Sequence, residues 1–116
     1  MNYTLEKRTL AFSENLIDFC AKVPKNSINI PLINQLVRSG TSIGANYCEA
    51  NGASSKKDFR NKIYICKKES QETEYWLRLA LKANPSLGEQ IDLLRNENSQ
   101  FILIFGKILS TINKQN

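Results

Sequence analysis

Histidine is absent from this chain of 116 residues. Its absence removes the commonest general base and the commonest protein ligand of transition metals, so a nucleophile activated by histidine is excluded. A glycine-rich phosphate loop is also missing, because Gly40 and Gly44 both lie within a helical pattern. We therefore expect a protein that is not an enzyme and that has no catalytic residue, no metal and no cofactor.

Cysteines are few, and long apolar runs are missing. Cys20, Cys48 and Cys66 lie in segments of helical apolar periodicity without the spacing of a metal site, which predicts buried free thiols. The most apolar run, residues 101–105, is too short to span a bilayer, and the N-terminal residues lack the apolar core of a signal peptide. We expect a cytoplasmic protein that does not interact with membranes.

Acidic residues are fewer than basic ones. The chain has 11 Asp and Glu residues and 16 Lys and Arg residues, which gives a net charge of +5. This excess favours an anionic partner, either a nucleic acid or the acidic face of a protein. It is also typical of a soluble protein that happens to be basic. The length predicts one domain over residues 1–116, large enough to bury about two thirds of its unfolded surface.

The strict alternation of a β-strand is absent, and four segments have helical periodicity instead. Pro24 ends the first segment, while Ser55 and Ser86, each followed three residues later by an acidic residue, predict the starts of the third and fourth. The expected helices cover residues 4–22, 29–51, 55–83 and 86–112. Short loops favour antiparallel neighbours, so we predict an all-α, up-down-up-down four-helix bundle. Its third helix, about 42 Å long, is expected to project beyond the core.

The second expected helix divides into two arcs at 100° per residue. Gly40 and Gly44 lie on the apolar arc, where they allow close approach of another helix. The opposite arc carries Arg38, Asn46 and Glu49 among hydroxyl and amide side chains such as Ser39. This composition fits a hydrogen-bonded interface, and it is also compatible with a solvated surface.

The third expected helix divides into three arcs. An inner stripe from Phe59 to Leu81 is expected to face the core. A second arc combines Trp76 and other apolar residues with Glu69 and Glu72, which predicts a subunit interface; burial of Trp76 in the monomer core is the alternative. A di-iron site built on the carboxylates is not expected, because such sites use Glu-x-x-His pairs.

The remaining arc of the third helix is basic and is termed the basic stripe. Its cations can neutralise successive phosphates of a nucleic acid, and its tyrosines can stack on unpaired bases. Glu74 interrupts it, and a long surface helix also uses Lys and Arg for solubility. The members of the basic stripe are Lys56, Lys57, Arg60, Tyr64, Lys67, Lys68, Tyr75, Arg78 and Lys82.

About half of the chain resembles a known family in its motifs. The segments that carry the resemblance are residues 30–32, 36–39, 42–47, 49–50, 55–59, 68–69, 72–73 and 75–77. They resemble the four-helix bundle proteins of the 23S rRNA intervening-sequence family, some of which are labelled ribosomal-protein-like. The first and fourth helices match only in pattern. The family's motif positions fall on Arg38, Asn46, Glu49, Glu69, Glu72 and Trp76.

The resemblance implies a short bacterial bundle that assembles as a homopentamer around a central channel, encoded in some bacteria within insertions in the large ribosomal RNA gene. A similar bundle is the accessory protein of diversity-generating retroelements, where it is a basic, barrel-shaped partner of a reverse transcriptase and its RNA. The family has no accepted active site. The six motif residues are therefore expected to form an oligomer interface or a buried polar network.

Two functions remain open. The first is a homo-oligomeric ring that binds RNA or another nucleic acid through the basic stripe, with an affinity that falls steeply with salt. The second is an oligomeric protein-interaction scaffold or accessory subunit, for example of a nucleic-acid-processing protein, whose positive charge serves steering or solubility.

Overall fold

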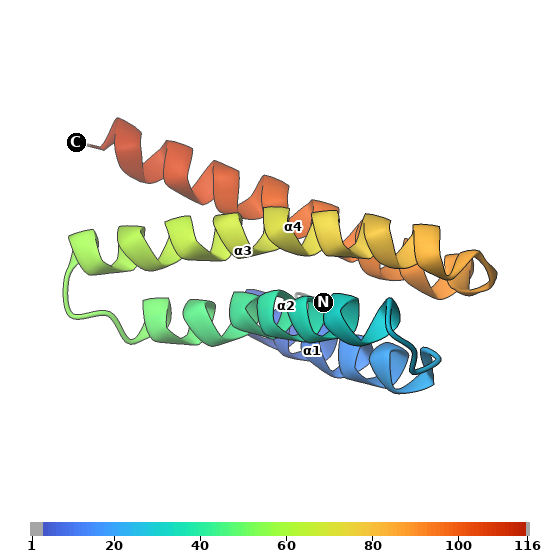
Figure 1. The fold of residues 1–116 in the computed structure, drawn as a ribbon. Helices are drawn as coiled ribbons and strands as arrows, with labels where there is room; N and C mark the ends of the chain where they lie inside the picture. Colours follow the sequence, from blue (N-terminus) through green and yellow to red (C-terminus); the bar gives the residue numbers. More distant parts are fainter. Residues whose placement is uncertain (1–3, 116) are drawn as a thin grey trace.

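Four α-helices pack in chain order around one apolar core in the computed structural model, which describes residues 4–115 (Figure 1). Each helix packs against the preceding one and α1 closes onto α4, so that α1 and α3 lie on a diagonal. The predicted all-α, antiparallel four-helix bundle is confirmed for these residues. The elements are α1 (Leu5–Lys22), α2 (Asn29–Asn51), α3 (Lys56–Ala83), the 3₁₀ turn η1 (Pro85–Leu87) and α4 (Gly88–Lys114).

Local signals account for most helix ends, with one exception before α4. The hydroxyl of Ser55 accepts a hydrogen bond from the backbone amide of Asp58 at 3.0 Å, as its position before α3 predicts. The cap predicted at Ser86 is wrong, because Ser86 lies inside η1 and α4 begins after it without a side-chain cap. Pro85 causes the difference: its fixed φ starts a tight turn that takes up the predicted first residues of the helix.

The core is rich in aromatic side chains. Phe101 is fully buried and packs edge-on against Phe12, with ring centroids 5.4 Å apart. The guanidinium of Arg8 lies 5.6 Å from the centre of the Phe101 ring, so a cation caps the aromatic cluster. None of the helices in residues 4–115 is long and apolar enough to cross a membrane.

Two glycines allow α1 and α2 to approach closely. A Cβ atom at Gly40 would overlap the side chain of Leu16, and one at Gly44 would lie 3.2 Å from Cβ of Thr9. The tight helix contact predicted for Gly40 and Gly44 is therefore confirmed. It brings α1 onto the side of α2 that carries the glycines, while α3 packs on a neighbouring side that includes Ser39.

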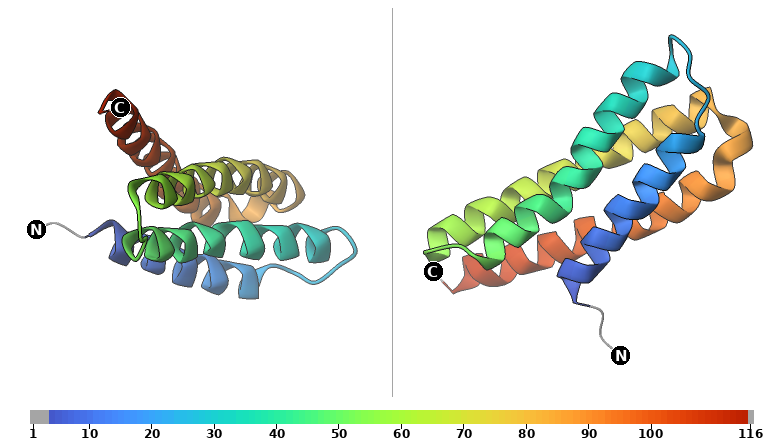
Figure 2. Two further views of the ribbon diagram at one scale, coloured as in Figure 1. Left: turned by 90° about the vertical axis from the view of Figure 1, so that its left-hand side faces the viewer. Right: turned by 90° about the horizontal axis from the view of Figure 1, so that it is seen from below.

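One end of the bundle has only three helices. α1 has 18 residues and α3 has 28, so the first turns of α3 extend past α1 (Figure 2). The last turns of α2 and α4 accompany them, and the end of α4 diverges from α3 in Figure 1. The sequence predicts that α3 projects beyond the core. In the structure, α3 projects beyond α1 but not beyond α2 and α4. We term this part, with the connector at residues 52–55, the open end.

The prediction of three buried thiols is correct for Cys66 and wrong for Cys48. Burial raises the pKa of the Cys66 thiol to about 12 and that of the half-buried Cys20 to about 11. Cys48 is exposed, because the preceding Tyr47 takes the inward position at this turn of α2 and its ring packs 6.0 Å from that of Phe105. All three thiols are free, as predicted.

Candidate nucleic-acid interface

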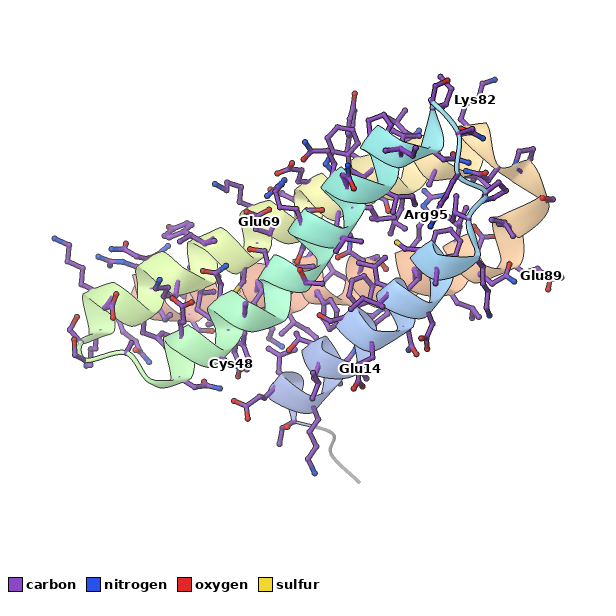
Figure 3. All side chains as sticks on the ribbon, turned by 60° about the horizontal axis from the view of Figure 1, so that its bottom comes forward. Glu14, Cys48, Glu69, Lys82, Glu89 and Arg95 are labelled. Carbon is purple, nitrogen blue, oxygen red and sulfur yellow. The ribbon has the colours of Figure 1, made fainter. Side chains whose placement is uncertain are left out.

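The basic stripe runs along the side of α3 that faces away from the core. Ile63, Cys66 and Leu77 are fully buried and fix the rotation of the helix. The outward face then carries the stripe over about 39 Å at 1.5 Å per residue, from Lys56 to Lys82. Lys82 at the far end reaches into solvent in Figure 3. The stripe is therefore long enough to follow several nucleotides of a single strand.

The cations of the stripe differ in exposure. Arg60 and Lys67 are half-buried, and the Lys67 ammonium lies at the seam with α4, about 4.0 Å from where a Cβ on Gly106 would stand. These two side chains have less freedom than the rest of the stripe, which lowers the entropy that binding costs. The exposed cations are Lys56, Lys57, Lys68, Arg78 and Lys82.

The cations of the basic stripe form no close ion pair within the described residues. In residues 4–115, no stripe cation has a carboxylate within 4.0 Å. Four other cations, which lie on α1, α2, α4 and the α2-facing side of α3, are all in ion pairs at or below 3.3 Å. Five further cations in the described part of the chain also form no ion pair, but they are spread over α1, the following loop and α4: Lys7, Lys22, Lys25, Lys107 and Lys114. The seven cations of the basic stripe are therefore the largest group of unpaired positive charge on one helix face.

Glu74 does not neutralise the stripe. Its carboxylate accepts hydrogen bonds from the Arg95 guanidinium on α4, the shortest at 2.8 Å, and this contact raises the pKa of Arg95. The Glu74 charge, which the sequence places within the stripe, is therefore paired with Arg95. This ion pair links α3 to α4 along the edge where the two helices pack.

Tyr64 and Tyr75 both present much of their rings to solvent, with 48% and 58% of their surface exposed. The Tyr64 hydroxyl accepts a hydrogen bond from the side-chain amide of Asn113 at 3.2 Å. The Tyr75 ring meets Trp76 edge-on at 5.1 Å between centroids. Both rings are therefore positioned by neighbours and still accessible, as base stacking requires.

Four of the six family-motif residues form one network between α2 and α3. Arg38 donates a hydrogen bond to Glu69 at 3.3 Å and another to Glu72, and Trp76 Nε1 donates to Glu72 at 3.1 Å. The bonds from Trp76 and Arg38 lower the pKa of the Glu72 carboxyl, and the bond to Glu72 raises the pKa of Arg38. The polar arc of α2 thus serves an interface inside the monomer at these positions.

The other two motif residues lie outside this network. Glu49 accepts a hydrogen bond from Lys62 at 2.6 Å, whereas Asn46 donates to the carbonyl and hydroxyl oxygens of Ser42 on its own helix. Trp76 falls between its two predicted environments: it is half-buried and packs against the core cluster, with part of the indole exposed.

Two buried polar pairs were not predicted. The hydroxyls of Ser39 and Thr73 hydrogen-bond at 3.0 Å between α2 and α3, with both side chains fully buried. The amides of Asn29 and Asn84 exchange two hydrogen bonds, at 2.9 and 3.0 Å. The only sequence signal for the second pair is Asn84 before Pro85, which predicts a helix end. Both pairs fix the relative positions of α2 and α3, and hence the stripe.

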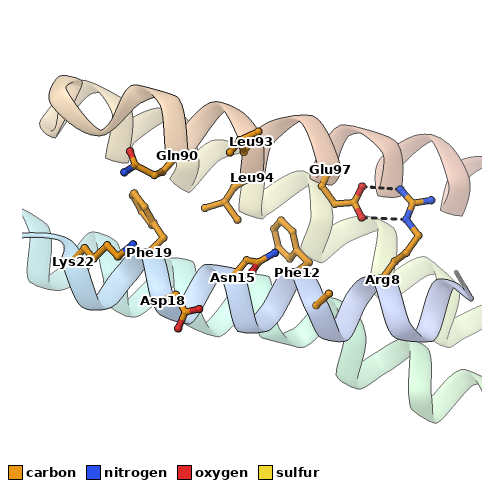
Figure 4. A pocket seen from close by; sticks show the side chains of 11 residues that line it. Arg8, Phe12, Asn15, Asp18, Phe19, Lys22, Gln90, Leu93, Leu94 and Glu97 are labelled. Atoms are coloured by element: carbon orange, nitrogen blue, oxygen red, sulfur yellow. Dashed lines mark hydrogen bonds and ion pairs between the residues drawn. The ribbon is translucent and has the colours of Figure 1, made fainter.

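A hollow lies between α1 and α4, and its charge differs from that of the basic stripe. It encloses about 460 Å³ over an apolar floor that includes Phe12, Phe19 and Leu94 (Figure 4). One end is closed by a two-bond pair between Arg8 and Glu97, the shorter bond at 2.7 Å. Its rim carries charges of both signs, so it offers no concentrated field to an anion. Within residues 4–115, no group of three or more His, Cys, Asp or Glu side chains could hold a metal ion.

The lowered pKa of Glu72 predicts a small loss of stability in acid. Because the folded-state pKa lies below the unfolded value, the stabilisation is present above the unfolded pKa and is lost as the pH falls through the folded one. We expect the melting temperature to fall more between about pH 6 and pH 3 in the parent than in a Glu72→Gln variant. The contribution of Glu72 to the free energy of unfolding should not exceed about 1 kcal/mol, since the Arg38–Glu72 ion pair is partly exposed. Parallel pH curves would contradict this role of Glu72.

The fold and the stripe define a class: a small, basic, all-helical bundle whose α2 and α3 are joined by an arginine–carboxylate network. The chain belongs to the 23S rRNA-intervening sequence protein family, whose model matches residues 2–106, and the resemblance seen in the motifs is confirmed. Among solved structures it is similar to a protein of unknown function from the S23 ribosomal protein family of Bacteroides thetaiotaomicron. The two share 33% identity over 91% of this chain and 98% of the other, with a TM-score of 0.81. The comparison with curated proteins found no match.

Proposed function

We propose that this protein is a non-enzymatic bundle that binds RNA through the basic stripe of α3. The observation that carries the proposal is the run of cations without carboxylate partners along one exposed face. Neutralising phosphates with such cations releases counterions, which is the main source of affinity in electrostatic nucleic-acid binding. The exposed rings of Tyr64 and Tyr75 add stacking surfaces for unpaired bases.

The names of the relatives support RNA as the nucleic acid. The name of the family refers to the intervening sequence of 23S rRNA. The similar solved structure comes from a family named after a ribosomal protein. Unpaired RNA also fits the geometry, because a single strand can follow a straight helix and turn its bases toward side chains on that helix.

A salt titration tests the proposal. Labelled RNA that contains both paired and unpaired regions is titrated with the parent protein at low and at physiological salt. If the five exposed stripe cations each contact one phosphate of a single strand, the logarithm of the affinity should fall against the logarithm of salt with a slope of about −3 to −4. Absence of binding at low salt, or an affinity that does not change with salt, would refute the proposal.

We further propose that the protein works as a homo-oligomeric ring, most simply the pentamer that the family resemblance implies. Large apolar side chains remain uncovered on the monomer, including Leu10 and Ile17 on α1 and Ile30 on α2, each more than half exposed. Trp76 on α3 is a further candidate for a subunit contact. Uncovered apolar residues on more than one helix are compatible with head-to-tail contacts, which form a ring when the rotation between subunits closes.

Truncation of Trp76 is expected to weaken assembly. Aromatic anchors at subunit contacts commonly contribute about 2 kcal/mol or more when replaced by alanine, so a Trp76→Ala ring should dissociate at a higher protein concentration than the parent. Light scattering across a dilution series measures this change. Gln100→Ala, at an exposed polar site on α4, is the control. If Trp76→Ala keeps the mass of the parent at every dilution, Trp76 is not at the interface.

A protein-interaction scaffold is the second candidate, favoured by the same exposed apolar residues Leu10, Ile17 and Ile30. A pull-down from nuclease-treated lysate tests it with the parent and an Ile17→Ser variant. A protein recovered in stoichiometric amount by the parent and lost with the variant would support the scaffold. Recovery of nucleic acid alone, before nuclease treatment, would support RNA binding.

A further inference from the structure

The open end of the bundle contains a basin of about 610 Å³. Three segments that are far apart in the sequence form its walls: the connector at residues 53–55, the first turns of α3 and the last turns of α4. Figure 1 shows these segments together at the end where α4 diverges from α3. The volume lies within the range of about 300–1,000 Å³ typical of sites for small molecules.

Three stripe cations line this basin, namely Lys56, Lys57 and Arg60. None of the described residues that line it is acidic, and none of the three cations has a carboxylate within 4.0 Å. Arg60 is half-buried, whereas Lys56 and Lys57 are exposed, and a planar guanidinium suits two-bond recognition of a phosphate. The rest of the stripe is an outward-facing line of charge, whereas here the charges surround a hollow.

The basin also has an apolar side. Phe59 and Ile112 line it from α3 and α4, and both are half-buried. Phe59 packs against the core cluster, so its ring is held in place. Ser54, on the connector, adds a hydroxyl to the lining of the basin. The neighbouring Ser55 hydroxyl is engaged as the cap of α3. Positive charge, a hydroxyl and an anchored aromatic ring therefore meet in one concavity.

We propose that this basin binds one phosphorylated nucleotide unit of an RNA strand, with the phosphate on Lys56, Lys57 and Arg60 and the base against Phe59 and Ile112. The inference rests on the proposed function and adds the point at which the strand is anchored. The outer part of the stripe then guides the following phosphates. A free mononucleotide has the same chemistry and serves as a probe of the basin by itself.

Two variants with equal loss of charge test the proposal. Lys56→Gln/Lys57→Gln/Arg60→Gln removes the basin cations, and Lys68→Gln/Arg78→Gln/Lys82→Gln removes three exposed cations elsewhere on the same helix. Affinity for single-stranded RNA is measured by anisotropy at one salt concentration, and binding of adenosine monophosphate by calorimetry. We expect the basin variant to lose RNA affinity about tenfold more than the control and to lose mononucleotide binding, which the control keeps.

The apolar side of the basin has a separate test. Phe59→Leu keeps an apolar side chain but removes the ring. It is expected to weaken binding of adenosine monophosphate severalfold and to leave binding of inorganic phosphate unchanged. Equal weakening of both ligands would show that Phe59 only supports the fold of the open end and would overturn its role against the base.

The outcomes separate this inference from the proposed function. If the parent binds RNA and both triple variants lose affinity equally, the basin is not the anchor and the RNA-binding proposal stands. If adenosine monophosphate binds the basin variant as well as the parent, the basin assignment is wrong. A parent that binds the mononucleotide and no RNA would refute the proposed function and overturn the anchoring role of the basin.

Discussion

Replacing Lys57, Arg60, Lys67 and Lys68 together by glutamate is expected to lower RNA affinity by about 100- to 1,000-fold at physiological salt. The four changes take the net charge from +5 to 5 − 8 = −3 and turn the N-terminal half of the stripe from attractive to repulsive. Each phosphate contact that is lost also removes a released counterion, so the slope of log affinity against log salt should become less steep by about 0.7 for each contact. Anisotropy titrations at several salt concentrations measure both effects.

The matched control places the same charge change elsewhere. Lys7, Lys22, Lys25 and Lys107 are exposed cations on α1, the following loop and α4, and their replacement by glutamate also gives a net charge of −3. This control is expected to keep RNA affinity within a few-fold of the parent, because distant exposed charges are screened over about 8 Å at physiological salt. Equal losses in the two variants would mean that overall charge, and not the stripe, attracts the RNA. Both variants should keep the helical circular dichroism and the mass of the parent.

Phe101→Ala is expected to cause the largest loss of stability of any single change proposed for this chain, about 3–5 kcal/mol in the free energy of unfolding. Phe101 is fully buried, so its truncation leaves a cavity. It also removes the edge-on contact with Phe12 and the contact between the Arg8 guanidinium and the Phe101 ring. Urea unfolding measures the change. Leu103→Ala lies two residues along the same helix at a site 68% exposed, and it should cost less than about 0.5 kcal/mol. A loss below about 1 kcal/mol for Phe101→Ala would contradict this packing.

Much of the fold was predictable because its signals are local. Pro24 and Asn84 end their helices and Ser55 caps α3 within a few residues of where spacing places them. The start of α4 was missed because two local signals compete there: the cap pattern at Ser86 favours a helix, and Pro85 imposes a turn first. The exposure of Cys48 has a tertiary cause, since it depends on Tyr47 taking the inward position against Phe105 on α4.

The stripe was predictable to the same degree because it lies on one helix, where spacing alone decides which residues share a face. Its details depend on the neighbouring helix. Lys67 lies at the seam with α4, and Glu74 pairs with Arg95 from a segment 21 residues away. The basin combines residues near 53–60 with residues near 112–115, so no pattern within one helix could indicate it.

The measurement that tests the central claim most directly is ultraviolet crosslinking of the parent protein to bound RNA, followed by mass spectrometry of the crosslinked peptides. RNA that lies along the basic stripe should crosslink to peptides of α3, above all those that contain Tyr64 and Tyr75, because exposed aromatic rings lie within reach of its bases. The crosslinks should decrease as salt rises, in parallel with the affinity. Crosslinks confined to α1 and α2, with none on α3, would contradict the account.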